Sequence, residues 1–309
     1  MRNTFIKTLT EIGKKDTNVM LLTGDLGFNA LEPFRDALPR QYVNVGVAEQ
    51  NMVGVAAGLA LSGKRVFCYS IIPFATFRCC EHIRDDLAYH NLPVTMVGVG
   101  SGYAYGILGS THHSLEDVAV LRSFPNMTVL CPGDPLEVEA LTHGIMKQHG
   151  PCYLRLGKAG EPNIHKKPLE NCAIGKAITL HTGKDVTIVA TGSMLQTAAE
   201  ARELLETEHI SAGLVSMHTL KPFDEEIVQR VVQETALIAT VEEHSAIGGL
   251  SSAVAQVLSQ MSGHAPHLTI ATPDSFATDT GSQKFFREKV GLTAEKIAAS
   301  IRHYLPAHA

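Results

Sequence analysis

Short apolar runs rich in β-branched residues recur along the first half of the chain, separated by longer stretches with helical periodicity. The strand-like runs span residues 19–23, 42–45, 66–70, 94–99 and 127–131. Helical patterns lie between them, and the clearest are at 74–89 and 136–148. Such alternation of strands and helices is typical of a parallel sheet with helices on both faces.

The same alternation returns in the second half, after a segment rich in glycine, proline and charge. Strand-like runs occupy residues 186–190, 212–217, 237–241 and 268–271, and helical patterns occupy 195–205 and 294–304. We therefore predict an α/β protein with two doubly wound, mainly parallel-sheet domains at 1–160 and 173–309. Residues 161–172 are the predicted linker.

The composition is that of an ordinary globular protein and excludes some function classes. Of 309 residues, 45% are hydrophobic and 18% are charged, with a formal net charge of −5. Without a long basic run, nucleic-acid binding is not expected. No apolar run reaches membrane-spanning length, so no membrane partner is expected either. The six cysteines are interpreted as reduced thiols, and the protein is predicted to be cytoplasmic.

One carboxylate, Glu49, interrupts an apolar, small-residue stretch at residues 42–61. Gly46 ends the preceding strand, and a helix is expected from Ala48 onward. Glu49 would then lie in the first turn of a buried helix, where an isolated charge is costly. The carboxylate must be paired, protonated or used in chemistry. A structural alternative is a helix-start glutamate that is bonded to backbone donors and favoured by the helix dipole.

The residues from 45 to 52, Val-Gly-Val-Ala-Glu-Gln-Asn-Met, followed by Gly54, Gly58 and Gly63, resemble the cofactor-activating segment of the transketolase family. Enzymes of this family use thiamine diphosphate. The resemblance extends over nearly the whole chain and implies a pyrimidine-binding domain followed by a transketolase C-terminal-like domain. It also implies that Glu49 contacts the aminopyrimidine ring of the cofactor, where a carboxyl group shares a proton with a ring nitrogen.

The resemblance also implies three further contacts on the cofactor side. Phe77 would stack on the pyrimidine ring and Phe74 would form a wall, and helical spacing would place both on one face. The alternative for this pair is ordinary core packing. Asp25 matches an acid on the cofactor side, and Asn29 nearby is a candidate for substrate binding.

A glycine-rich stretch, residues 98–113, has the flexible backbone of an active-site loop. It ends in Gly-Ser-Thr-His-His-Ser, which resembles a family segment whose histidine faces the substrate. His112 falls on that histidine, and an imidazole can donate or accept protons near neutral pH. His112 could instead form hydrogen bonds at a helix entry. His113 is a weaker candidate for substrate contact.

Two departures from the family pattern affect the choice of sugar. Transketolases that act on sugar phosphates have a histidine at the position of Gly100 and an aspartate at that of Leu108. Since leucine accepts no hydrogen bond, the donor must be recognised differently here. Tyr103 and Tyr105 are nearby candidates, although either could be packing.

Two cations further along the chain are candidates for binding the substrate. Arg155 and Lys158 fall where the family places a cation against the terminal phosphate of the substrate. A lysine binds an anion as a point charge and lacks the bidentate geometry of arginine.

The Gly-Asp-Gly segment with which related enzymes hold the diphosphate, through a divalent cation, is missing from this sequence. No set of metal ligands is predicted in this chain. The expectation is a split enzyme in which a separate N-terminal subunit carries the diphosphate domain and binds most of the Mg²⁺. A heterotetramer is expected, with self-association across the pyrimidine domain.

The predicted activity is transfer of a two-carbon ketol unit from a ketose to an aldose phosphate. Because of Gly100 and Leu108, the donor is expected to be an unusual sugar, for example a sulfonated, deoxy or branched one. Two alternatives remain open. One is the β subunit of a 2-oxo acid dehydrogenase, and the other is a non-catalytic assembly subunit with the same fold.

Overall fold

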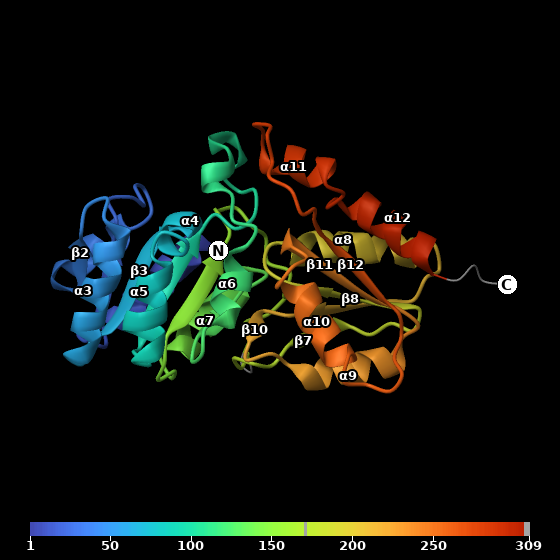
Figure 1. Ribbon diagram of the computed structural model, residues 1–309, viewed down its shortest axis with the longest axis horizontal. Helices are drawn as coiled ribbons and strands as arrows, with labels where there is room; N and C mark the ends of the chain where they lie inside the picture. The colour runs from blue at the N-terminus through green and yellow to red at the C-terminus, as the bar shows by residue number, and fades with distance from the viewer. Residues whose placement is uncertain (170–171, 306–309) are drawn as a thin grey trace.

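Two β-sheets lie side by side along the long axis of the molecule, each packed between helices (Figure 1). The computed structural model describes residues 1–169 and 172–305. The first sheet is built mainly from the first half of the chain, blue to green in the figure. The second sheet is built from the second half, yellow to red. The predicted α/β class is therefore confirmed.

Seven strands form the first sheet, in the order β10-β5-β6-β4-β3-β1-β2. All neighbours pair in parallel except β10, which runs antiparallel to β5. Every residue of β1, β4 and β6 is buried, as expected for a parallel sheet covered on both faces. The strands are β1 Val19–Thr23, β2 Tyr42–Asn44, β3 Arg65–Ile71, β4 Val94–Val99, β5 Thr128–Leu130, β6 Cys152–Leu156 and β10 Thr219–Lys221.

The helices around this sheet connect successive strands. They are α1 Arg2–Gly13, α2 Glu32–Ala37, α3 Glu49–Leu61, α4 Ile72–Ala75, α5 Cys80–His82, α6 Asp117–Ser123 and α7 Pro135–Ile145. Short 3₁₀ turns, η1 Pro39–Gln41, η3 Gly106–Leu108 and η4 Ser110–His112, and a π-helical segment, η2 Ile83–Tyr89, complete the set.

The predicted helix at 74–89 is wrong as a single element. It is divided into α4, a turn at 76–79, α5 and η2. The hydroxyl of Thr76 donates a hydrogen bond to the carbonyl oxygen of Ile72 (2.7 Å), and the backbone of Thr76 leaves helical geometry. A threonine that bonds back to the preceding turn competes with continuation of the helix.

Five strands form the second sheet, in the order β12-β11-β8-β9-β7, with only β7 antiparallel to its neighbour. The strands are β7 Ile178–His181, β8 Val186–Ala190, β9 Ala212–Ser216, β11 Ile238–Ser245 and β12 His267–Thr272. The helices are α8 Met194–Thr207, α9 Glu225–Glu234, α10 Leu250–Leu258, α11 Gln283–Lys289 and α12 Ala294–Tyr304.

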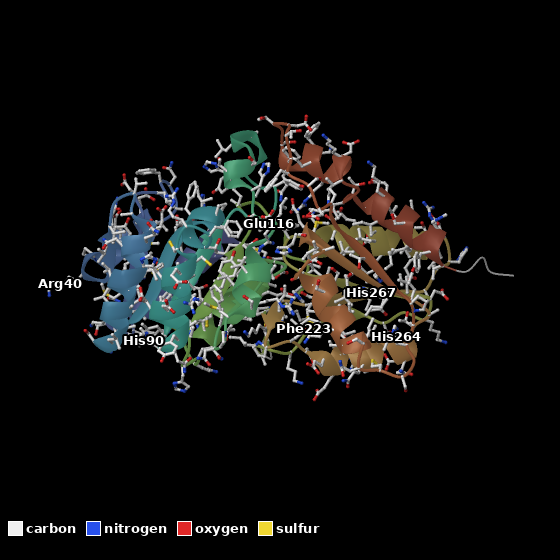
Figure 2. The ribbon with its side chains drawn as sticks, in the orientation of Figure 1. Arg40, His90, Glu116, Phe223, His264 and His267 are labelled. Carbon is white, nitrogen blue, oxygen red and sulfur yellow. The ribbon has the colours of Figure 1, made fainter. Side chains whose placement is uncertain are left out.

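The two halves are joined more closely than the sequence pattern predicts. Strand β10 comes from the second half, yet it forms an edge of the first sheet. Phe223, just after β10, lies where the halves meet (Figure 2) and packs on an apolar cluster that contains Val129 and Val189. A strand of three residues has too little alternation to be recognised from sequence.

The predicted linker packs against the first half along part of its length. The backbone N–H groups of Ile164 and His165 donate hydrogen bonds to one oxygen of Asp134 (2.8 and 2.9 Å). Residues 170–171 of the predicted linker and 306–309 of the predicted second domain lie outside the described residues.

All six cysteines are free thiols, and four of them are buried. Within the described ranges, every helix is too short or too polar to span a bilayer.

Candidate active site

Glu49 is the first residue of α3, and its side chain is only 1% exposed. One carboxylate oxygen, Oε1, accepts a hydrogen bond from the hydroxyl of Ser70 (3.1 Å). The other, Oε2, accepts from Nη1 of Arg78 (2.9 Å). Gly24 lies so close that a Cβ there would come within 3.3 Å of the carboxyl carbon. The predicted burial is therefore confirmed, and the carboxylate is paired with side chains of β3 and of the turn after α4.

Arg78 is the functional candidate that the sequence analysis missed. It lies in the turn after α4, and its side chain is 44% exposed. Its guanidinium carbon lies 4.5 Å from the ring centroid of Phe74, a cation–π distance. A signal was present in the sequence, because Arg78 is the only charged residue between Arg65 and Glu81. A buried carboxylate on the neighbouring helix needs such a partner.

The two predicted aromatic residues have separate surroundings. Phe74, half-buried in α4, contacts the imidazole of His112 edge to face, with ring centroids 5.1 Å apart. Phe77 lies beyond the end of α4 and lines a different cavity of about 210 Å³, together with Phe276 of the second half. The prediction that the pair shares a helix face is wrong, because α4 ends at Ala75.

His112, at the end of η4, lies beside Phe74 and Tyr105. Its Nδ1 is 3.0 Å from the hydroxyl of Thr111. Burial lowers the pKa of His112 below its ordinary value. The imidazole is therefore neutral at pH 7 and can both accept and donate a proton.

Tyr105 occupies space that Gly100 leaves open. Gly100 has a φ of +93°, and a Cβ there would come within 2.2 Å of the Tyr105 ring. The glycine at this position thus permits the tyrosine ring to lie against the backbone. Nζ of Lys158 is 5.3 Å from the centroid of that ring, and the lysine side chain is exposed. Leu108, also exposed, ends η3 nearby in the same loop.

Tyr103 and His113 are buried in an aromatic cluster. The Tyr103 ring stacks on Phe286 with centroids 4.7 Å apart, and His113 packs edge to face on both rings. Burial raises the pKa of Tyr103 to about 12 and lowers that of His113. Direct substrate contact, predicted for both, does not fit these positions. His113 does line the cavity that holds Phe77.

Arg155 is also placed differently from the prediction. Its guanidinium Nε donates to Asp117 (2.8 Å), and Nη2 donates to the carbonyl oxygens of Ser114 and Glu243 (2.7 and 3.2 Å). Burial alone would raise the pKa of Asp117, but Arg155 outweighs it and holds that pKa below its ordinary value. Arg155 therefore fastens the two halves together, and the predicted contact with a substrate phosphate does not fit.

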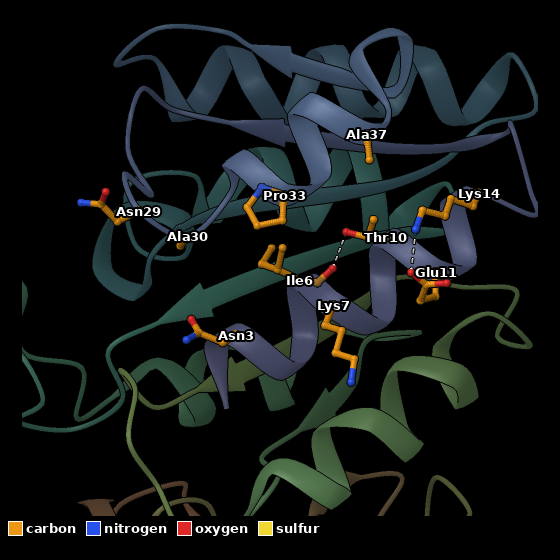
Figure 3. A pocket seen from close by; sticks show the side chains of 10 residues that line it. All are labelled: Asn3, Ile6, Lys7, Thr10, Glu11, Lys14, Asn29, Ala30, Pro33 and Ala37. Carbon is orange, nitrogen blue, oxygen red and sulfur yellow. Dashed lines mark hydrogen bonds and ion pairs between the residues drawn. The ribbon is translucent and has the colours of Figure 1, made fainter.

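Asp25 and Asn29 lie on opposite sides of the same loop. Asp25 follows Gly24, the residue next to the Glu49 carboxylate, and its Oδ1 accepts a hydrogen bond from Asn44 (2.9 Å). Asn29 lines a groove of about 440 Å³ between α1 and α2 (Figure 3). The residues lining this groove include none of the other predicted site residues. The expectation that Asn29 contacts substrate near His112 therefore does not fit the structure.

One continuous series of contacts remains. It runs from Glu49 through Arg78 and Phe74 to His112 and then Tyr105. A buried carboxylate, a flat ring and a neutral imidazole in this order fit the pyrimidine half of thiamine diphosphate. In the part of the chain that the structure describes, no cluster of three or more His, Cys, Asp or Glu side chains could hold a metal ion.

Two family profiles match the sequence. "Transketolase, pyrimidine binding domain" matches residues 1–161, and "Transketolase, C-terminal domain" matches residues 175–297. Together they extend over most of the chain.

Individual relatives are similar over almost their whole length. One of the two subunits of the apulose-4-phosphate transketolase of Phocaeicola vulgatus is 37% identical over 305 residues, which is 98% of this chain and 97% of the relative. The 6-deoxy-6-sulfo-D-fructose transketolase subunit of Clostridium sp. (strain MSTE9) is 39% identical over 298 residues, 96% and 92% of the two chains.

A solved structure described as a split gene transketolase, inactive beta4 tetramer, has a TM-score of 0.90 and 37% identity. The similarity covers 98% of this chain and 97% of that one. Profiles, relatives and fold agree: this chain belongs to the transketolase family of thiamine-diphosphate-dependent enzymes, of which it carries the pyrimidine-binding and C-terminal domains.

Proposed function

We propose that this chain is one subunit of a transketolase that transfers a two-carbon ketol unit from a ketose to an aldose phosphate. The observation that carries the proposal is the carboxylate of Glu49, which is buried at the start of α3 within one contact series of His112. A carboxylate in that position is costly unless it is used or paired. Its main partner, Arg78, reaches solvent.

Each residue of the series has a proposed role toward the cofactor or the sugar. Glu49 would bind the aminopyrimidine ring through a nitrogen and share a proton with it. Phe74 would flank the ring. His112 would donate a proton to the sugar oxygens, or accept one from them, as the carbon–carbon bond breaks and re-forms. Thiamine diphosphate, when bound, supplies the nucleophilic carbon that attacks the ketose carbonyl.

The chain is proposed to act with a second subunit that carries the diphosphate domain and most of the Mg²⁺ ligands. The similarity to a separately encoded transketolase subunit and to a split-gene tetramer supports this division. Phe28 and Val47, on the loops before and after β2, are 72% and 74% exposed. Apolar side chains exposed near Glu49 favour a face that another chain covers. We expect a heterotetramer with contacts between pyrimidine domains, and its free thiols suit the cytoplasm.

The donor is proposed to be an unusual ketose. Leu108 offers no hydrogen bond, and Gly100 leaves room for Tyr105 where sugar-phosphate transketolases have a histidine. The names of two relatives specify apulose 4-phosphate and a sulfonated fructose. Lys158, exposed beside Tyr105, is the cation that we assign to an anionic group of the sugar.

The test is reconstitution. The chain is mixed with its diphosphate-domain partner, thiamine diphosphate and Mg²⁺, and ketol transfer is measured across a panel of ketoses and aldose phosphates. Turnover with a deoxy, sulfonated or branched ketose above that with ordinary sugar phosphates supports the proposal. No turnover with any ketose, despite a formed complex, contradicts it. Leu108→Asp should shift the donor profile toward ordinary sugar phosphates, and an unchanged profile removes position 108 from the argument.

A further inference from the structure

The two partners of the Glu49 carboxylate differ in how firmly they are held. Ser70, 0% exposed, lies on β3, which is paired on both sides by β1 and β4. Arg78, 44% exposed, lies in a four-residue turn between α4 and α5. Both carboxylate oxygens are engaged, one by each partner, and the side chain of Glu49 has almost no contact with solvent.

A ring that binds to Glu49 must therefore replace a partner that is already present. Ser70 cannot leave without distorting the centre of the sheet. Arg78 can leave, because Glu49 is the only polar partner of its side chain within the described residues. Its other contact is the face of Phe74. A long, solvated arginine side chain gains little from such a pair and can change rotamer at small cost.

We propose that Arg78 is a positioning residue that covers Glu49 in the cofactor-free subunit and moves off Oε2 when the aminopyrimidine ring binds. This inference rests on the function proposed above. The same movement uncovers the face of Phe74, so one rotamer change frees both the carboxylate and an aromatic surface.

The charge around Glu49 changes with that movement. While Arg78 is in place, its guanidinium favours the ionised carboxylate. Once it has left, the buried carboxyl group holds a proton more readily, as its role toward the ring nitrogen requires. The thiol of Cys79 is the other titratable neighbour. Burial and Glu49 raise the pKa of Cys79 to about 12, so this thiol stays neutral and supplies no charge. His112 lies on the far side of Phe74.

The experiment compares cofactor binding by reconstituted complexes that contain wild-type chain, Arg78→Met or the control Arg84→Met. Arg84 is similarly exposed but pairs with Glu81 and Asp85, away from the site. Calorimetric titration with thiamine diphosphate in Mg²⁺ should give a Kd lower by about threefold to tenfold for Arg78→Met. Arg84→Met should match the wild type.

Binding kinetics separate a cover from a merely structural arginine. With the cover present, the observed rate of cofactor binding should level off at high cofactor concentration, because release of Arg78 limits it. In Arg78→Met the rate should stay linear in concentration. Near-ultraviolet circular dichroism after rapid mixing follows both.

A Kd that is unchanged or higher for Arg78→Met, with unaltered kinetics, would overturn the proposal and make Arg78 a support of the bound ring. If Arg78→Met does not assemble, Arg78→Lys is used, since its ammonium binds the carboxylate less firmly. A Kd below wild type then supports the proposal, and one above it overturns it. Failure of the wild-type complex to bind the cofactor would instead refute the proposed function.

Discussion

Two buried glutamates, Glu49 in the first half and Glu243 in the second, are held in very different ways. Glu49 has two hydrogen-bond donors, one of them largely solvent-exposed. Glu243, at the junction of the halves, accepts five hydrogen bonds. The donors are the backbone N–H of Tyr103, the amide of Gln283 twice, the hydroxyl of Ser193 and the guanidinium of Arg287.

The difference separates a carboxylate that fastens the fold from one that is available for chemistry. The oxygens of Glu243 are engaged by donors from four different segments, so no ligand can compete for them without opening the junction. A Cβ on Gly102 would clash with this carboxylate at 2.3 Å, which leaves no space for a ligand. Glu49 has spare acceptor capacity and one replaceable partner. Burial alone therefore does not identify a catalytic acid, whereas burial with an incomplete set of rigid partners does.

The largest expected effect tests Glu49 itself. Glu49→Gln keeps the shape and the hydrogen bond to Ser70 but cannot share a proton with a ring nitrogen. Ketol transfer by the reconstituted enzyme should fall by about 10²–10⁴-fold, the usual contribution of a positioned acid–base group. Assembly, followed by size-exclusion chromatography, should be unchanged. A variant that keeps more than a tenth of the wild-type rate would remove Glu49 from the mechanism.

The next effect concerns stability and extends the comparison to a third carboxylate, Asp117. Arg155→Met would leave Asp117 buried without its cation, and this should lower the free energy of unfolding by about 3–5 kcal/mol. Urea unfolding followed by circular dichroism measures the loss.

The control for this prediction is the double variant Asp117→Asn, Arg155→Met. It should recover part of the stability, because no unpaired charge is then buried. The surviving Arg155→Met enzyme should keep its KM for the aldose phosphate. A KM raised tenfold or more would restore the substrate-binding role that the structure argues against.

A smaller effect is expected at the histidine pair. His112→Asn should lower kcat by about 10²-fold, because asparagine moves no proton. His113→Asn, the matched control, should keep kcat within a few-fold, since this ring is packed between Tyr103 and Phe286. Because burial lowers the pKa of His112, the wild-type rate should persist to pH values below 6.5 before protonation reduces it. Equal losses in both variants would contradict the assignment.

Local pattern sufficed for most elements of the fold. The buried strands at 19–23 and 94–99 and the helix at 294–304 have the predicted bounds, because apolar runs and amphipathic periodicity reflect burial directly. The three residues of β10 could not be found in this way. Their pairing with β5 depends on how the second half folds back onto the first.

The site divides along the same line. Glu49, Phe74 and His112 carry local motifs, and the structure brings them into one series of contacts. Arg78 has no motif, and only its proximity to Glu49 in space gives it a role. Arg155 shows the opposite failure, since a cation at a suggestive position is consumed by a buried partner 38 residues away in sequence.

The smallest effect concerns Glu137, another buried carboxylate with several donors, whose partner His165 titrates. Burial alone would lower the pKa of His165, but its hydrogen bond to Glu137 (2.8 Å) and the nearby charges of Glu137 and Asp134 raise it above the ordinary value. The folded chain thus binds this proton more tightly than the unfolded chain. The resulting stabilisation is complete below pH about 6.5 and is lost as the pH rises through the higher folded pKa.

His165→Gln removes this titration and keeps a side chain that can donate a hydrogen bond. Wild type should exceed the variant in free energy of unfolding by more at pH 6 than at pH 9, with a change on the order of 1 kcal/mol, measured by urea unfolding. The pKa of His218, which burial lowers, affects stability in the opposite sense, but His218 is present in both proteins and cancels in the difference. A difference that does not vary with pH would mean that the imidazole stays neutral beside Glu137. The carboxylate would then be held by neutral donors alone, as a second support of the fold like Glu243.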